Sequence, residues 1–125
     1  MTELERSPLV MVVDDQEPNV RAVGGLLARE GFDVAPCLGG AEAIERLVDL
    51  RPDLVLLDVR MPGMDGFEVL SRLLADDATR AIPVIMLTAD HERESLVRAF
   101  SAGAVDYITK PFVPEELLAR VRTHA

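Results

Sequence analysis

The chain has very little cysteine and no long apolar run. Cys37 is the only cysteine among 125 residues, so no internal disulfide can form, and a small buried thiol in a reducing compartment is expected. The first eight residues are polar apart from Met1 and Leu4, and no stretch approaches the roughly 20 apolar residues of a membrane span. These absences predict a cytoplasmic protein that has neither a signal peptide nor a membrane partner.

Positive charge is also scarce. Lys and Arg number 13 against 22 Asp and Glu, which gives a formal net charge of −9 at pH 7. Phosphate backbones and anionic lipids carry the same sign, so direct binding of nucleic acid is not expected. The acidic residues either form a solvated face or attract cations, among which Mg²⁺ is one candidate.

What the sequence does contain is a set of apolar runs that each stop at polar residues. If these runs are parallel strands, their carboxyl ends share one edge of a sheet, where open α/β folds bind ligands. The runs and their polar ends are residues 9–13 followed by Asp14 and Asp15, residues 54–57 followed by Asp58, residues 84–87 followed by Thr88, and residues 104–108 followed by Thr109 and Lys110.

Segments with helical spacing alternate with these runs. A fifth, weaker run at residues 32–36 ends in Pro36, which cannot donate to a strand ladder, so we expect it at an edge of the sheet. The pattern predicts a doubly wound, flavodoxin-like parallel sheet of five strands in the order 2-1-3-4-5, with five helices. The apolar helix positions are Val20, Val23 and Leu27; Ile44, Leu47 and Val48; Phe67, Leu70, Leu73 and Leu74; Leu96, Val97 and Phe100; and Leu117, Leu118 and Val121.

Proline and glycine mark the helix boundaries. Pro18 and Pro114 suit the first turn of a helix, and Gly31 and Gly103 suit the position after its end. The pair Gly24-Gly25 lies inside the first helix, where either close packing on the sheet or a kink would explain it. We expect a flexible N-terminus over residues 1–8 and one domain over residues 9–125, whose last helix is cut short if the chain is an excised domain.

The polar strand ends predict a metal-assisted phosphoryl-transfer site. Asp14, Asp15 and Asp58 would repel one another unless a cation intervened, and their hard oxygen ligands select Mg²⁺ or Mn²⁺. A carboxylate can attack phosphorus if the charge of the transferring group is neutralised, and Lys110 and the Thr88 hydroxyl could bind its oxygens. Each residue alone has an ordinary alternative as a helix cap or a turn former.

Taken together, these motifs resemble the receiver domain of two-component response regulators over essentially the whole chain. No position that defines the site of that family is missing. The resemblance rests on residues 12–15 (VVDD), residues 56–66 (LLDVRMPGMDG), residues 87–89 (LTA) and residues 103–112 (GAVDYITKPF).

The resemblance implies a role for each of these positions. Asp58 would accept a phosphoryl group from a histidine of a sensor kinase or a phosphotransfer protein. The Thr88 hydroxyl and the Lys110 ammonium would bind the oxygens of that phosphoryl group. Asp15 would bind Mg²⁺ directly and Asp14 mainly through water, with the backbone carbonyl of Arg60 as a further ligand. Such a protein would promote its own phosphorylation and dephosphorylation without being a turnover enzyme.

The resemblance also gives Lys110 and the residues around it specific roles. Lys110 would hold phosphoryl oxygens, and the Lys110–Pro111 peptide bond is expected to be cis, which would aim the lysine into the site. Thr88 and Tyr107 would form the switch that remodels the face made by the fourth helix, fifth strand and fifth helix. A homodimer through this face is a hypothesis, because Arg120 or Arg122 could pair with acids of a second copy.

Acid and base side chains near the site suggest two finer hypotheses. Asp106 is one acid with which Arg120 could pair across such a dimer. Arg60 and Asp90 lie two residues after Asp58 and Thr88, and their opposite charges are expected to shield the phosphoryl group partly from water.

Three other functions compete with the receiver interpretation. An aspartyl phosphohydrolase would carry an acid two residues after its nucleophile, where this chain has Arg60. A flavin-binding module would need a hydroxyl- or glycine-rich loop after the first strand, where this chain has Asp-Asp-Gln-Glu-Pro. The third is an interaction module of the same shape that no longer takes phosphate, against which the intact acids, Thr88 and Lys110 argue. The sequence does not select the partner kinase, the signal or the output.

Overall fold

The computed structural model describes residues 7–89 and 93–125, in which strands and helices alternate. None of the described helices is long and apolar enough to cross a bilayer. The elements in chain order are β1 (Leu9–Val13), α1 (Glu17–Arg29), β2 (Asp33–Cys37), α2 (Gly40–Leu50), β3 (Leu54–Asp58), α3 (Gly66–Ala75), β4 (Val84–Thr88), α4 (Arg93–Ser101), β5 (Asp106–Thr109) and α5 (Pro114–His124).

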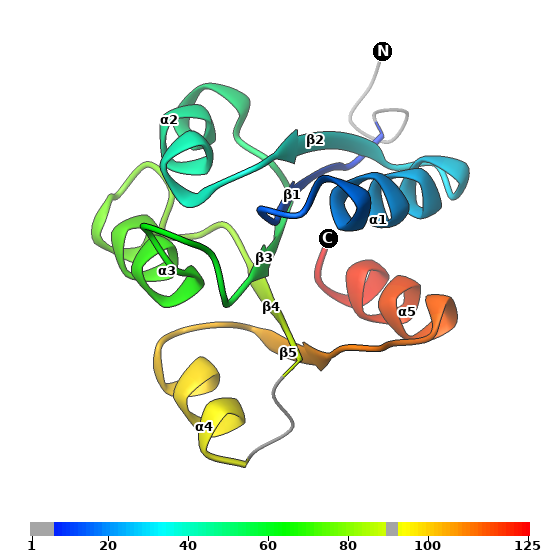
Figure 1. The fold of residues 1–125 in the computed structure, drawn as a ribbon. Helices are drawn as coiled ribbons and strands as arrows, with labels where there is room; N and C mark the ends of the chain where they lie inside the picture. The colour runs from blue at the N-terminus through cyan, green and yellow to red at the C-terminus, as the bar shows by residue number, and fades with distance from the viewer. Residues whose placement is uncertain (1–6, 90–92) are drawn as a thin grey trace.

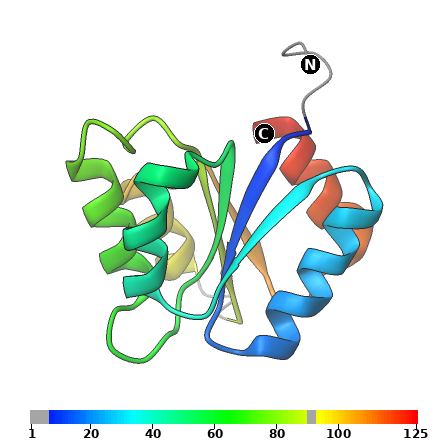
Figure 2. The same ribbon diagram turned by 90° about the horizontal axis from the view of Figure 1, so that it is seen from above.

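The strands form one parallel sheet in the order β2-β1-β3-β4-β5, which confirms the predicted topology. Figure 1 and Figure 2 show the helices on both faces: α1 and α5 cover one face, and α2, α3 and α4 cover the other. The order reverses between β1 and β3, whose carboxyl ends therefore flank the crevice in which this type of sheet binds ligands.

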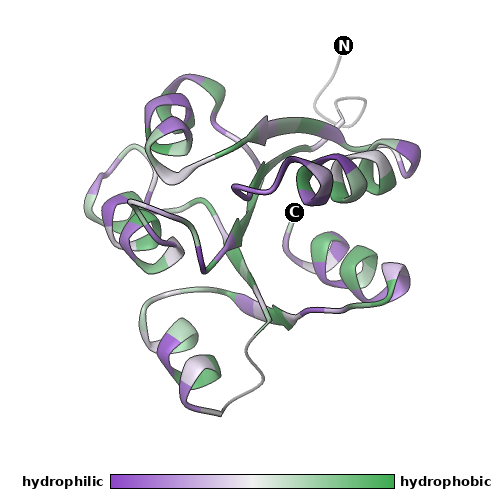
Figure 3. Ribbon diagram, viewed as in Figure 1, coloured by the Kyte–Doolittle hydropathy of each residue, from purple (hydrophilic) through white to green (hydrophobic). Residues whose placement is uncertain are grey.

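Alternate residues of the central strands enter two separate cores. Met11 and Leu57 pack in the cluster beneath α2 and α3, whereas Val12 and Leu56 pack in the cluster beneath α1 and α5. Because both faces are covered, β3 and β4 are buried along their whole length. Figure 3 shows hydrophobic residues along the central strands and mixed polarity on the helices.

The helix boundaries follow the predicted chemistry. Pro18 lies in the first turn of α1 and Pro114 begins α5. Gly31 and Gly103 follow the ends of α1 and α4 with φ angles of 93° and 108°, a left-handed conformation that glycine adopts without strain. At the start of α3 the Asp65 carboxylate accepts a hydrogen bond from the Glu68 N–H at 2.9 Å and so caps the helix.

The bounds of β2 and β5 differ from the predicted runs. β2 covers Asp33–Cys37, one residue later than the expected run. β5 begins at Asp106, although the apolar pattern starts at Ala104. The Ala104 N–H instead donates to the Ala99 carbonyl at 3.1 Å, so this residue still closes the end of α4.

The two glycines inside α1 have different environments. A Cβ on Gly24 would lie 3.3 Å from Cγ1 of Val34 in β2, whereas one on Gly25 would meet nothing within 4 Å. Close packing on the sheet therefore explains Gly24 and leaves Gly25 without a steric reason.

β2 lies at one edge of the sheet, as its proline predicts. The Pro36 carbonyl oxygen accepts a hydrogen bond from Arg46 Nη1 of α2 at 2.7 Å. The same guanidinium lies 3.4 Å from the Sγ atom of the buried Cys37. Burial raises the pKa of this thiol, and Glu42 adds to the effect while Arg46 opposes it. Cys37 is therefore an unreactive core thiol.

Candidate functional site

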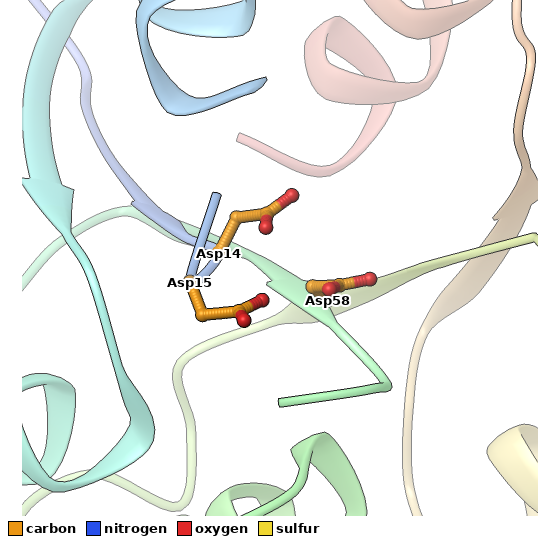
Figure 4. A group of neighbouring side chains, drawn as sticks. All are labelled: Asp14, Asp15 and Asp58. Atoms are coloured by element: carbon orange, nitrogen blue, oxygen red, sulfur yellow. The ribbon is translucent and has the colours of Figure 1, made fainter. Parts of the chain in front are cut away.

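The predicted polar residues meet at the carboxyl edge of the sheet. Asp14 and Asp15 follow β1, and Asp58 is the last residue of β3 (Figure 4). Thr88 is the last residue of β4, and Lys110 follows β5 directly. The structure thus brings together residues that lie up to 96 positions apart in the sequence.

The three aspartates form a compact acidic cluster. One carboxylate oxygen from each of Asp14, Asp15 and Asp58 lies within 4.8 Å of the others, with Asp14 and Asp58 buried and Asp15 half-buried. Burial raises the pKa of Asp58, and the charges of Asp14 and Asp15 raise it further. An all-oxygen donor set of net negative charge fits a hard divalent cation, which would remove this repulsion.

Lys110 supplies the positive charge within the site. Its Nζ atom lies 3.2 Å from Oδ2 of Asp14 and 3.3 Å from Oδ1 of Asp58. The ammonium acts against burial by lowering the pKa of Asp58 and so favours its ionised form. Lys110 is also the only lysine in the chain, so no other ammonium side chain can replace it.

Backbone contacts fix the position of this lysine. The Lys110 N–H donates to the Thr88 carbonyl at 2.6 Å, and Thr88 is paired with Thr109 in the sheet register. The Lys110–Pro111 peptide bond is cis, as the family resemblance implies. The Thr88 side chain is buried at the end of β4, the strand that pairs with β3.

Asp14 is oriented by a residue that sequence reasoning missed. The Gln16 N–H donates to Oδ1 of Asp14 at 2.9 Å, and this leaves Oδ2 for Lys110. The Asp14 N–H donates in turn to the Cys37 carbonyl at 3.1 Å, which extends the pairing of β1 with β2. No side-chain signal could have revealed the role of Gln16, because its backbone makes the contact.

Gly66 is a second position whose role the sequence did not reveal. A Cβ at this residue would lie 2.4 Å from the Asp58 carbonyl oxygen and 2.9 Å from the Val59 Cα. The Gly66 N–H donates to the Val59 carbonyl at 2.8 Å, so the start of α3 is held directly against the backbone of Asp58. Only glycine permits this approach without displacement of the backbone.

Tyr107 and Thr88 line the same cleft of about 520 Å³ between the sheet and the starts of α3 and α4. Tyr107 is buried in this structure, in the core on the face of the sheet that α2, α3 and α4 cover (Figure 1). Arg60 is exposed at the rim of the cleft. Asp90, the other residue expected to shield the site, lies outside the described residues.

Within one chain Arg120 already has an acidic partner, and pairing across a dimer stays a hypothesis. Arg120 Nη1 lies 2.7 Å from Oδ1 of Asp106, and His124 Nε2 lies 3.0 Å from Oδ2. Burial opposes ionisation of Asp106, but the Tyr107 N–H, Arg120 and His124 outweigh it and lower the pKa of this carboxyl. Arg122 pairs with Glu30 of the same chain at 2.6 Å. Both arginines of the last turns of α5 therefore have acidic partners within the same chain.

Comparison with known proteins agrees with this geometry. Residues 10–122 match the family model described as response regulator receiver domain. The chain is 42% identical over 115 residues to the DNA-binding dual master transcriptional regulator RpaA of Synechocystis sp., covering 92% of this chain and 48% of RpaA. It is 44% identical over 113 residues to the DNA-binding response regulator MtrA of Mycobacterium tuberculosis, covering 90% of this chain and 48% of MtrA.

Solved structures show the same fold. The chemotaxis protein CheY4 of Vibrio cholerae superposes with a TM-score of 0.90 at 29% identity, covering 96% of this chain and 100% of that protein. CheY4 is therefore similar to this chain over its full length, whereas the chain spans about half the length of RpaA and MtrA.

Proposed function

Because this chain belongs to the response regulator receiver domain family of two-component signalling proteins, we propose that Asp58 accepts a phosphoryl group from a phosphohistidine. The donor would be a sensor histidine kinase or a histidine phosphotransfer protein. One observation carries the proposal: the buried Asp58 carboxylate lies 3.3 Å from Lys110 and within 4.8 Å of two further carboxylates at the crevice of the sheet.

The chemistry is transfer of a phosphoryl group between two side chains. An oxygen of ionised Asp58 attacks phosphorus, an O–P bond forms, and the N–P bond of the donor breaks. The electron pair of that bond returns to the imidazole, which takes up a proton from solvent. Lys110 and the Thr88 hydroxyl would bind the phosphoryl oxygens, over which the negative charge of the transferred group is spread.

Asp15, Asp14, Asp58 and the backbone carbonyl of Arg60 would hold Mg²⁺, with Mn²⁺ as an alternative. The ion would neutralise phosphoryl charge that Lys110 alone cannot balance. Support comes from the donor set, because three carboxylates share the site with a single ammonium. Asp14 would act mainly through water, since its oxygens already bind Lys110 and the Gln16 N–H.

Thr88 and Tyr107 are the proposed switch. Both line the cleft beside α4, so movement of Thr88 toward a phosphoryl group would alter the space around the tyrosine ring and thereby the face formed by α4, β5 and α5. We propose that this face carries the output, including any homodimer. Because Asp106 and Arg120 pair within one chain, such a dimer must either break that pair or use other contacts.

The domain itself is not proposed to bind nucleic acid. RpaA and MtrA are named as DNA-binding, but the chain matches only about half of each, and its net charge of −9 repels phosphate. We also propose that it acts in the cytoplasm and promotes its own phosphorylation and dephosphorylation without being a turnover enzyme.

The decisive test is phosphorylation of the purified protein. Incubation with a small acyl phosphate and Mg²⁺ should add one phosphoryl group, detected by intact-mass spectrometry, and chelation of Mg²⁺ should prevent it. Asp58→Asn should abolish the modification, whereas Asp49→Asn, which changes an exposed carboxylate on α2, should leave it intact. Modification of Asp58→Asn at the wild-type rate would contradict the proposal. Rapid hydrolysis of a phosphate monoester, which a receiver domain does not turn over, would instead favour a phosphohydrolase.

A further inference from the structure

Helix α4 is only weakly anchored to the domain. Of its described side chains, Ala99 alone is buried, and Ser95 is half-buried. The apolar residues that predict the helix point outward instead: Leu96, Val97 and Phe100 are 41%, 52% and 45% exposed. Burial of an apolar face therefore contributes little to the position of α4, and individual contacts gain importance.

One such contact joins α4 to α3. The Arg98 guanidinium carbon lies 3.8 Å from the centroid of the Phe67 ring, a cation–π stack. Among residues 7–89 and 93–125, Arg98 forms no ion pair that would compete with this contact. Phe67 follows Gly66, whose backbone lies against that of Asp58. The stack thus connects α4 to the part of α3 nearest the acidic cluster.

We propose that the stack of Arg98 on Phe67 is a latch that holds α4 in its present position and sets the balance between two positions of the helix. The inference rests on the proposed phosphorylation of Asp58. Arg98 is a positioning residue in this scheme and does not contact the phosphoryl group.

The cleft beside the site shows how phosphorylation could act on this latch. Thr88 and Tyr107 line it from the sheet, Ser95 and Arg98 line it from α4, and Phe67 lines it from α3. α4 begins at Arg93, five positions after Thr88. A displacement of Thr88 toward the phosphoryl group therefore moves the start of α4 relative to Phe67 and separates the guanidinium from the ring.

The expected effect is modest and measurable. An exposed cation–π pair changes the ratio of two conformations about two- to fivefold. A ligand that binds the minor conformation gains apparent affinity by the same factor when the latch is removed. Beryllofluoride with Mg²⁺, which imitates a phosphoryl group on a carboxylate, can serve as this ligand.

The experiment is a beryllofluoride titration followed by NMR of the Leu96 and Val97 methyl groups. Arg98→Ala and Phe67→Leu should each lower the midpoint two- to fivefold, and the double variant should lower it no further. Arg98→Lys, which keeps a cation over the ring, should restore most of the wild-type midpoint. Arg72→Ala, the matched control, removes an exposed arginine of α3 and should have no effect.

The outcomes separate the latch from the proposed function. If the wild-type methyl signals do not respond to beryllofluoride although Asp58 is phosphorylated in the mass-spectrometric test, the latch alone fails. If Asp58 is not phosphorylated either, the proposed function fails and the latch fails with it. If the wild type responds but Arg98→Ala matches its midpoint, or the two single effects add in the double variant, the latch alone is overturned.

Discussion

The close contact between Gly66 and the backbone of Asp58 predicts that even one methyl group at this position is damaging. Gly66 is the first residue of α3, where alanine would ordinarily favour the helix. The Cβ of Gly66→Ala would instead lie 2.4 Å from the Asp58 carbonyl oxygen and 2.9 Å from the Val59 Cα. Both are backbone atoms, at the end of β3 and in the residue after it, so no flexible side chain can move aside.

The size of the effect follows from this geometry. Overpacking a core typically costs about 1–3 kcal/mol, and a collision with backbone belongs at the upper end. We therefore expect Gly66→Ala to lower the free energy of unfolding by about 3 kcal/mol and the Tm by roughly 10 °C. The displaced Asp58 should also accept phosphoryl groups more slowly in the part of the population that remains folded.

Gly25→Ala is the matched control, because it adds the same methyl group in open space. Nothing lies within 4 Å of the new Cβ, and the residue lies inside α1. Removing a glycine from a helix interior should raise stability by about 1 kcal/mol. Gly24→Ala, whose Cβ would lie 3.3 Å from Val34, should fall between the two.

Urea unfolding followed by circular dichroism measures all three variants, since the chain contains no tryptophan. A Gly66→Ala protein as stable as Gly25→Ala would refute the steric argument. It would show that α3 can shift away from Asp58 at little cost.

Three further changes test the charged contacts. Asp106→Asn should lower the free energy of unfolding at neutral pH by about 2 kcal/mol, because it weakens charge-assisted bonds to Arg120 and His124. In the wild type, the stabilisation from ionised Asp106 is present above the ordinary Asp pKa of 3.8 and is lost as the pH falls through the lowered pKa of the folded state. The stability of the variant should therefore fall less steeply with acid, which thermal unfolding at a series of pH values measures. Lys110→Met should slow phosphorylation of Asp58 roughly 100-fold in mass-spectrometric time courses and raise the pH at which the reaction begins. Normal rates would exclude a role for the ammonium. Arg60→Ala should accelerate loss of the phosphoryl group severalfold, and an unchanged or slower loss would argue against shielding.

The sequence predicted the sheet and the charged residues of the site for one physical reason. Apolar runs that are buried on both faces identify parallel strands, and the carboxyl ends of parallel strands share an edge. The amino-acid pattern alone therefore places Asp14, Asp58, Thr88 and Lys110 together. Proline and glycine residues predicted where several of the helices begin and end.

What the sequence could not predict depends on contacts between distant backbone segments. The role of Gly66 requires that residues 59–65 fold back onto Asp58, and the pairing of Arg120 with Asp106 requires the packing of α5 on β5. The apolar residues of α4 predicted a helix correctly, but their exposure follows from how α4 lies on the sheet. Helical spacing alone does not reveal whether the apolar face of a helix packs against the sheet or stays exposed.

The edge strand β2 has a consequence for behaviour in concentrated solution. A second sheet that adds to an exposed edge needs alternating donors and acceptors, and such growth is a route to aggregates. Pro36 offers no donor, and the guanidinium of Arg46 already occupies its carbonyl oxygen. At Pro36 a neighbouring copy therefore finds neither a free donor nor a free acceptor, which disfavours the addition of another strand at this point of β2.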